Sequence, residues 1–247
     1  MIPNPIRKVL SSMQKHRVRA LLMGGQACVF YGAAEFSRDT DLAIVADAAN
    51  LARLRRALDD LQADVIAVPS CQLKFLRRGH AVHFRCQHPE APRMRVDVMS
   101  KMRGVDVFLA LWKRRTTIAL PDGTRCDLLS LPDLVQAKKT QRDKDWPMIR
   151  RLVEANYFEN CKRPNKSQVV FWLRELRTPQ LLIEVAQKND AACQRATSQR
   201  PLLTLALAGS IRELQMALQA EEAVEREIDQ RYWLPLRKEL EQLRHAR

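Results

Sequence analysis

Strand-like sequence is confined to the first half of the chain, and this asymmetry is the strongest constraint on the fold. Apolar or alternating runs predict strands at residues 18–23, 41–45, 64–68, 81–86 and 94–99, and a hairpin at 116–129 that turns at 121–124. Helical patterns occupy residues 4–16, 26–33 and 50–61, and then 131–141, 146–156, 167–177, 180–188 and 202–244. We therefore expect an α+β fold in which residues 1–150 form a mixed sheet flanked by helices. Residues 151–247 are expected to form an all-helical domain.

Positive charge is concentrated in the same half. The 247 residues include 42 Lys and Arg against 28 Asp and Glu, a net charge of +14. Residues 1–150 hold 26 basic and 15 acidic residues, whereas residues 151–247 hold 16 and 13. A surplus of this size favours a polyanionic partner such as nucleic acid, because Lys and Arg release the counterions condensed on phosphates. A basic protein without a nucleic-acid role is the alternative.

Several protein classes do not fit the sequence. No apolar run approaches the roughly 18 residues of a membrane span, so no membrane role is expected. The first residues, Met-Ile-Pro-Asn-Pro, lack the charged-then-apolar order of a signal peptide, and six scattered cysteines without a Cys-x-x-Cys pair indicate reduced thiols. We therefore expect a cytoplasmic protein. A zinc site at Cys86 and His83 is disfavoured, because alternation along a strand sends them to opposite faces.

Gly24 and Gly25 join a predicted strand directly to a predicted helix. Glycine lets the backbone approach a ligand closely, and the free N–H groups at the start of a helix favour phosphate. An ordinary turn at the end of the strand is the alternative.

Three aspartates lie in strand-like sequence near this junction. Asp39 and Asp41 are two residues apart, so an extended backbone directs both carboxylates to one side, where a divalent cation would relieve their repulsion. Asp97 interrupts an apolar strand, and facing the first two acids from an adjacent strand it would complete a two-metal site. The alternatives are a polar turn at Asp39 and Asp41, and a solvent-exposed Asp97 that pairs with Arg95 or Lys101.

This order of residues resembles the nucleotidyltransferase superfamily of polymerase β-like fold, whose signature is hydrophobic-Gly-Gly/Ser, Asp-x-Asp and a third Asp on a later strand. The matching residues are Met23-Gly24-Gly25, Ser37-x-Asp39-x-Asp41-Leu42 and Asp97. Gly24-Gly25-Gln26-Ala27 and Tyr31-Gly32 are most similar to the AbiEii/MenT-type toxin nucleotidyltransferases. The resemblance covers about residues 18–152.

The resemblance implies an enzyme that transfers a nucleoside monophosphate from an NTP to an acceptor with Mg²⁺ or Mn²⁺. Asp39, Asp41 and Asp97 would be the catalytic metal ligands, and Gly24, Gly25 and Ser37 would cradle phosphate. Lys138, Arg142 and Asp145 would form part of the nucleotide-binding site, where Lys138 contacts the triphosphate and Asp145 orients Lys138. The three residues share one face if their helix is continuous. A solvated face with local salt bridges is the alternative for these three.

The basic catalytic half favours RNA, such as tRNA, as the acceptor over a cationic small molecule. A role as the toxin of a toxin–antitoxin or phage-defence system, with an antitoxin protein as partner, follows from the resemblance alone. A catalytically silent protein of the same fold that binds RNA or a partner protein is the rival interpretation. Leu236, Leu240 and Leu243 share one face of the last predicted helix, and could pack on the rest of the chain or on another chain.

Overall fold

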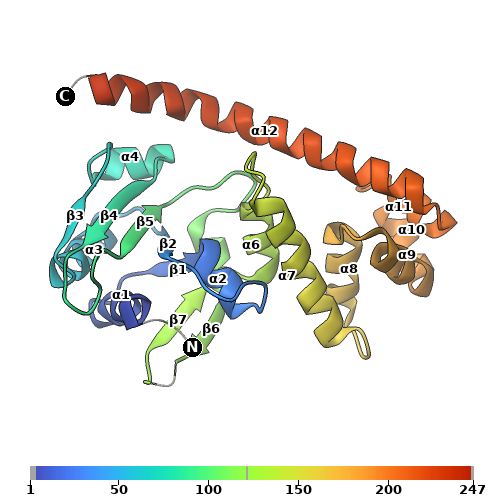
Figure 1. Ribbon diagram of the computed structural model, residues 1–247, viewed down its shortest axis with the longest axis horizontal. Helices are drawn as coiled ribbons and strands as arrows, with labels where there is room; N and C mark the ends of the chain where they lie inside the picture. Colours follow the sequence, from blue (N-terminus) through green and yellow to red (C-terminus); the bar gives the residue numbers. More distant parts are fainter. Residues whose placement is uncertain (1–3, 121, 246–247) are drawn as a thin grey trace. The chain divides into compact units, whose positions relative to one another are not determined.

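The computed structural model describes residues 4–120 and 122–245 (Figure 1). Residues 1–3, from the segment compared with a signal peptide, lie outside the described residues, as do Pro121, the first residue of the predicted hairpin turn, and residues 246–247. The described chain forms two compact units. The first contains residues up to 30, residues 34–137 and residues from 232 onward, and the second contains residues 31–33 and 138–231.

A seven-stranded mixed sheet organises the first unit, so the predicted α+β class is confirmed. The strand order is β3-β4-β5-β2-β1-β7-β6. The strands are β1 (Ala20–Met23), β2 (Asp39–Ile44), β3 (Ala63–Val65), β4 (Val82–Cys86), β5 (Arg95–Met99), β6 (Thr116–Ala119) and β7 (Arg125–Leu128). β2 pairs with β1 antiparallel and with β5 parallel, which places β2 at the centre of the sheet.

Successive residues of the central strands place a buried row of the sheet next to a partly exposed polar row. One row across β1, β2, β5 and β4 is almost wholly buried and consists of Leu22, Leu42, Val98 and Val82. The next row is only partly exposed and consists of Met23, Asp41, Asp97 and His83. Cys86 is buried and His83 is partly exposed on β4, so the two residues lie on opposite faces of the strand as the alternation predicts.

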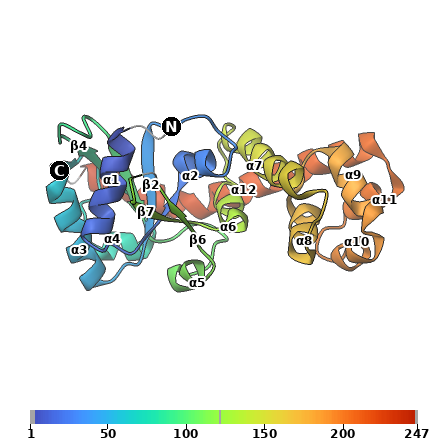
Figure 2. The ribbon, with the colours of Figure 1, turned by 90° about the horizontal axis from the view of Figure 1, so that it is seen from below.

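Six helices are described in the first unit before the C-terminal segment. They are α1 (Asn4–Lys15), α2 (Gly24–Phe30), α3 (Ala48–Asp60), α4 (Leu73–Arg78), α5 (Phe108–Lys113) and α6 (Leu131–Ala137). α1 and α3 lie side by side, and the Ser12 hydroxyl of α1 donates a hydrogen bond to the Ala57 carbonyl of α3 over 3.0 Å (Figures 1 and 2). Neither α4 nor α5 is predicted, because six residues carry too little periodicity to identify a helix.

The second unit is helical. Its helices are α7 (Asp145–Asn160), α8 (Lys166–Glu175), α9 (Pro179–Lys188), α10 (Asp190–Ala196), α11 (Leu203–Ala208) and α12 (Ile211–His245), of which α12 continues into the first unit from Tyr232. The prediction of one helix over residues 202–244 is wrong: Gly209, at φ +73°, ends α11 in the left-handed conformation. Trp172 fills the core, where its ring lies 5.1 Å from that of Tyr157.

The end of α12 packs on its own chain. Leu236 is 8% exposed, and the Glu239 carboxylate accepts a hydrogen bond from Arg78 Nε over 2.7 Å and lies 2.9 Å from His80 Nε2. Leu236 therefore packs on the rest of the chain, which is one of the two alternatives given for the face with Leu240 and Leu243. Among the described residues, no helix has the length and apolar character needed to cross a membrane.

Candidate functional site

The carboxylate of Asp41, on β2, lies directly over Gly24, the residue that follows the end of β1. β1 ends at Met23 and α2 begins at Gly24 without an intervening residue. Met23 lies opposite Asp41 in the antiparallel pairing of β1 with β2. A Cβ placed on Gly24 would overlap the Asp41 side chain, and Gly24 has a φ of +65°. Both the space and the backbone conformation therefore require glycine at this position.

Gly25 and Ser37 meet in the same place. A Cβ on Gly25 would lie 2.7 Å from Ser37 Oγ and 3.2 Å from Ser37 Cβ. The Ser37 hydroxyl donates a hydrogen bond to the Asp39 carbonyl over 3.2 Å, which fixes the approach to β2. The structure thus brings four of the predicted residues, Gly24, Gly25, Ser37 and Asp41, into one contiguous group.

The parallel pairing of β2 with β5 adds the remaining aspartates. Asp41 lies opposite Asp97, and Asp39 lies opposite Arg95. Thr40, between the two acids, points into the core with no exposed surface, so Asp39 and Asp41 both point to the other face. All three predicted carboxylates therefore belong to one face of adjacent strands.

Asp97 is not free on this face, because one of its oxygens is already bound. Arg95 Nε donates to Asp97 Oδ1 over 2.8 Å, and His83 Nδ1 lies 2.9 Å from the same oxygen. Burial raises the pKa of Asp97, but the hydrogen bonds and charges of His83 and Arg95 outweigh it and lower that pKa below its ordinary value. Of the two alternatives for Asp97, the pairing with Arg95 is present, although the side chain is only 17% exposed.

The sequence interpretation missed His83 as part of this group. The signal that could have identified it is the register of β4 against β5, which places His83 opposite Asp97. The charges of Asp39 and Asp41 also act on Arg95, whose pKa is raised by the hydrogen bond to Asp97 first and then by the three carboxylates. Arg95 therefore supplies positive charge that acts on all three carboxylates.

Gln26 is an orphaned polar residue beside the Gly-Gly junction. Its side chain is 1% exposed, and neither its amide nitrogen nor its amide oxygen has a hydrogen-bond partner among the described residues. A buried amide without partners is costly, and such groups are commonly satisfied by a water molecule or a ligand. The orphaned amide therefore fits a ligand group at the start of α2.

The donor set suits a hard divalent cation in part. Mg²⁺ takes one or two carboxylates together with substrate phosphates, and Asp39 and Asp41 supply such a pair. Asp97 could join them only by sharing a carboxylate that Arg95 and His83 already hold. In the part of the chain that the structure describes, no group of three or more His, Cys, Asp or Glu side chains is close enough to hold a metal ion.

Lys138, Arg142 and Asp145 form a cluster in the second unit. The condition under which they would share one helix face is not met, because α6 ends at Ala137 and α7 begins at Asp145. They nevertheless meet: Lys138 Nζ donates to Asp145 Oδ1 over 3.0 Å, and Arg142 Nε donates to Asp145 Oδ2 over 2.8 Å. The turn between the helices, not helical spacing, brings them together.

Asp145 in this cluster is buried, with a side chain 3% exposed, whereas that of Lys138 is 11% exposed. The local salt bridges of the alternative are therefore present and the Arg142 side chain is 58% exposed, but Lys138 and Asp145 are not on a solvated face. Burial raises the pKa of Asp145, but Lys138, the Thr140 hydroxyl and Arg142 outweigh it and lower that pKa.

Comparison with known proteins identifies no family for this chain. No protein-family model matches the sequence, and no curated protein matches it. The geometry of the group around Gly24 and the sequence resemblance are therefore the basis of any functional conclusion.

Proposed function

We propose that this chain is a metal-dependent nucleotidyltransferase of polymerase β-like fold, which transfers a nucleoside monophosphate from an NTP to an acceptor hydroxyl. The observation that carries the proposal is the seat of the Asp41 carboxylate over Gly24, with Asp97 opposite Asp41 on the next strand. Two glycines, a serine and three acids come together from three separate segments, residues 24–25, residues 37–41 and Asp97. An ordinary turn after β1, the alternative for Gly24 and Gly25, would not require a serine and three acids beside the two glycines.

Phosphoryl transfer relies on positioning and charge neutralisation more than on covalent participation of the protein. Asp39 and Asp41 would hold Mg²⁺ or Mn²⁺, which supplies positive charge against the triphosphate. The oxygen of the acceptor hydroxyl forms a bond to the α-phosphorus, and the bond from the α-phosphorus to pyrophosphate breaks. Asp97 would take the hydroxyl proton on Oδ2, since Oδ1 is bound by Arg95 and His83.

Phosphate contacts would come from two places. The backbone at Gly24 and Gly25 and the hydroxyl of Ser37 would contact the triphosphate, since the absence of side chains at the glycines leaves the backbone accessible. Lys138 would neutralise charge as pyrophosphate leaves. Asp145, with Arg142, would hold Lys138 in position, as their hydrogen bonds at 2.8–3.0 Å suggest.

The acceptor in this proposal is RNA, with tRNA as the leading candidate. The support is the charge of residues 1–150, where 26 basic residues stand against 15 acidic ones. A toxin role that an antitoxin protein restrains is an extension of the proposal and rests on the resemblance to the AbiEii/MenT-type enzymes.

A second candidate is a catalytically silent protein of the same fold that binds RNA or a partner protein. One observation favours it: Asp97 Oδ1 is bound by Arg95 and His83 and so is not available to a metal ion. In this case the acidic group would have only a structural role, and the protein would bind its partner without turnover.

Transfer of label from each α-³²P-labelled NTP onto total tRNA in the presence of Mg²⁺ tests the two candidates. We expect label on RNA with the wild-type protein and none with Asp39→Asn/Asp41→Asn. Asp59→Asn, on the exposed face of α3, removes a carboxylate outside the site and is the matched control. Absence of label with every NTP, although the NTP binds, would favour the silent protein.

A further inference from the structure

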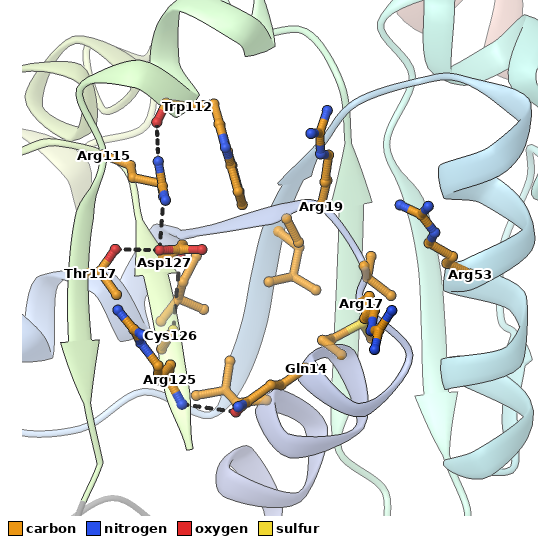
Figure 3. A pocket seen from close by; sticks show the side chains of 16 residues that line it. Gln14, Arg17, Arg19, Arg53, Trp112, Arg115, Thr117, Arg125, Cys126 and Asp127 are labelled. Atoms are coloured by element: carbon orange, nitrogen blue, oxygen red, sulfur yellow. Dashed lines mark hydrogen bonds and ion pairs between the residues drawn. The ribbon is translucent and has the colours of Figure 1, made fainter. Parts of the chain in front are cut away.

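A second charged site lies in the first unit at the other end of β1. A cavity of about 490 Å³ is lined by residues at the start of β1, by α1 and α3, and by the hairpin of β6 and β7 (Figure 3). Five arginines from these segments surround it: Arg17, Arg19, Arg53, Arg115 and Arg125, which we call the arginine pocket. Gly24 follows the opposite end of β1. The length of this strand, about 13 Å at 3.3 Å per residue, therefore separates the arginine pocket from the acidic group.

Positive charge in the arginine pocket is largely uncompensated. Among the described residues that line it, Asp127 supplies the one carboxylate, and it is held by Arg115 Nε at 2.9 Å and by the Thr117 hydroxyl. The side chains of Arg17, Arg53 and Arg125 have no ion pair or hydrogen bond in the described structure. Converging guanidinium groups repel one another, so an anion in the cavity would stabilise them.

Trp112 positions two of the guanidinium groups without neutralising them. The Arg115 guanidinium lies 4.2 Å from the centre of the Trp112 ring, and that of Arg19 lies 6.0 Å from it. Phe108 stacks on the same ring at 5.6 Å and fixes its orientation. Figure 3 shows Trp112 and Arg19 along one side of the cavity and Arg53 directed toward it from α3. Cation–π contact leaves the N–H groups of Arg19 available to an oxyanion, whereas Arg115 already donates from Nε to Asp127 and from Nη1 to the Trp112 carbonyl.

We propose that the arginine pocket binds phosphodiester groups of a polynucleotide, and that this polynucleotide is the acceptor of the transfer reaction. The assignment to the acceptor rests on the proposed function, whereas the binding itself does not. Planar guanidinium groups pair with phosphate oxygens in a bidentate manner. The four that no carboxylate holds, Arg17, Arg19, Arg53 and Arg125, suit successive phosphates of a strand better than one free anion. The site is separate from the acidic group, so the strand and the triphosphate need not compete.

Binding of a fluorescein-labelled single-stranded RNA of about 20 nucleotides, followed by anisotropy between about 50 and 200 mM salt, tests the proposal. The test variant is Arg17→Gln/Arg19→Gln/Arg53→Gln. The matched control is Arg56→Gln/Lys101→Gln/Lys238→Gln, which removes the same charge from exposed positions outside the cavity. All six positions are exposed or partly exposed, and circular dichroism with thermal unfolding verifies that each variant folds.

Each single-strand phosphate contact contributes about 0.7 to the slope of log K against log salt. Loss of three contacts should lower the slope by about 2 and weaken binding by at least about tenfold at low salt, with a much smaller effect in the control. Equal RNA affinity of the two triple variants would overturn the proposal. So would unchanged RNA affinity together with loss of ATP or pyrophosphate binding, which would assign the pocket to a free phosphate ligand.

The two proposals can fail separately. Asp39→Asn/Asp41→Asn should abolish label transfer but keep RNA affinity, whereas the triple variant of the arginine pocket should keep NTP binding and lose RNA affinity. RNA binding that depends on the arginine pocket, in a protein without transfer activity, would support the pocket and refute the enzyme.

Discussion

Substitution of Gly24 by alanine tests the geometry of the candidate site directly. Alanine at φ +65° costs about 1–2 kcal/mol in backbone strain. The added methyl group would also overlap the Asp41 side chain, and overpacking of this kind costs about 1–3 kcal/mol. We therefore expect Gly24→Ala to lower the free energy of unfolding by about 2–5 kcal/mol in urea denaturation, with about a 100-fold loss of any transfer activity.

Gly123 offers a matched control for this substitution. Its φ is +81°, but a Cβ placed there meets no atom within 4 Å. Gly123→Ala therefore carries the backbone strain of about 1–2 kcal/mol without the overlap. The difference between the two variants measures the contact between Gly24 and Asp41. Equal losses of stability would refute the placement of the Asp41 carboxylate over Gly24.

A double-mutant cycle separates the overlap from the strain. Asp41→Gly removes the three atoms nearest to the new methyl group, Oδ2, Cγ and Cβ of Asp41. The combined loss in Gly24→Ala/Asp41→Gly should be smaller than the two single losses taken together, by about 1–3 kcal/mol. Strict additivity would contradict the predicted contact.

Two further predictions concern the charged clusters. The pKa of Asp97 is lower in the folded protein than its ordinary value of 3.8, so its stabilising contribution is present above that pH and is lost as the pH falls through the folded pKa. Asp97→Asn should consequently lose less stability than Asp59→Asn on acidification below pH 3.8, which urea titrations at several pH values can measure. Lys138→Met leaves the buried Asp145 without its lysine and should cost about 3 kcal/mol, whereas Lys188→Met, at an exposed pair, should have a much smaller effect in the same urea titration.

The local elements of the first unit could be predicted because their signals are local. Alternation of apolar residues identified β4 and β5, and the 3–4 spacing of Leu51, Leu54 and Leu58 identified α3. The same period of two predicts that Asp39 and Asp41 point to one side. The short helices α4 and α5 were missed because six residues hold fewer than two turns.

The long-range pairing could not be derived in the same way. Nothing local fixes β5 beside β2, yet this pairing places Asp97 opposite Asp41. The sequence places Lys138 and Asp145 on one face only if a single helix spans them, and their contact instead arises from the turn between two helices. Tertiary structure can bring the same residues together by another route, so a correct juxtaposition is weak evidence for the local structure assumed in predicting it.

The charges of the first unit explain why both its sites can persist in one fold. Three acids on one face would repel one another, and Arg95, with its hydrogen bond to Asp97 and its position opposite Asp39, offsets that repulsion. A cation bound at Asp39 and Asp41 would offset the repulsion among the carboxylates in place of Arg95, and would weaken the electrostatic attraction between Arg95 and these two acids. At the other end of β1 the balance is reversed, since Asp127 offsets only one of five arginines. The acidic group thus carries its own counter-charge, whereas the arginine pocket depends on a charge from outside the described chain, which is the requirement that a phosphate backbone would meet.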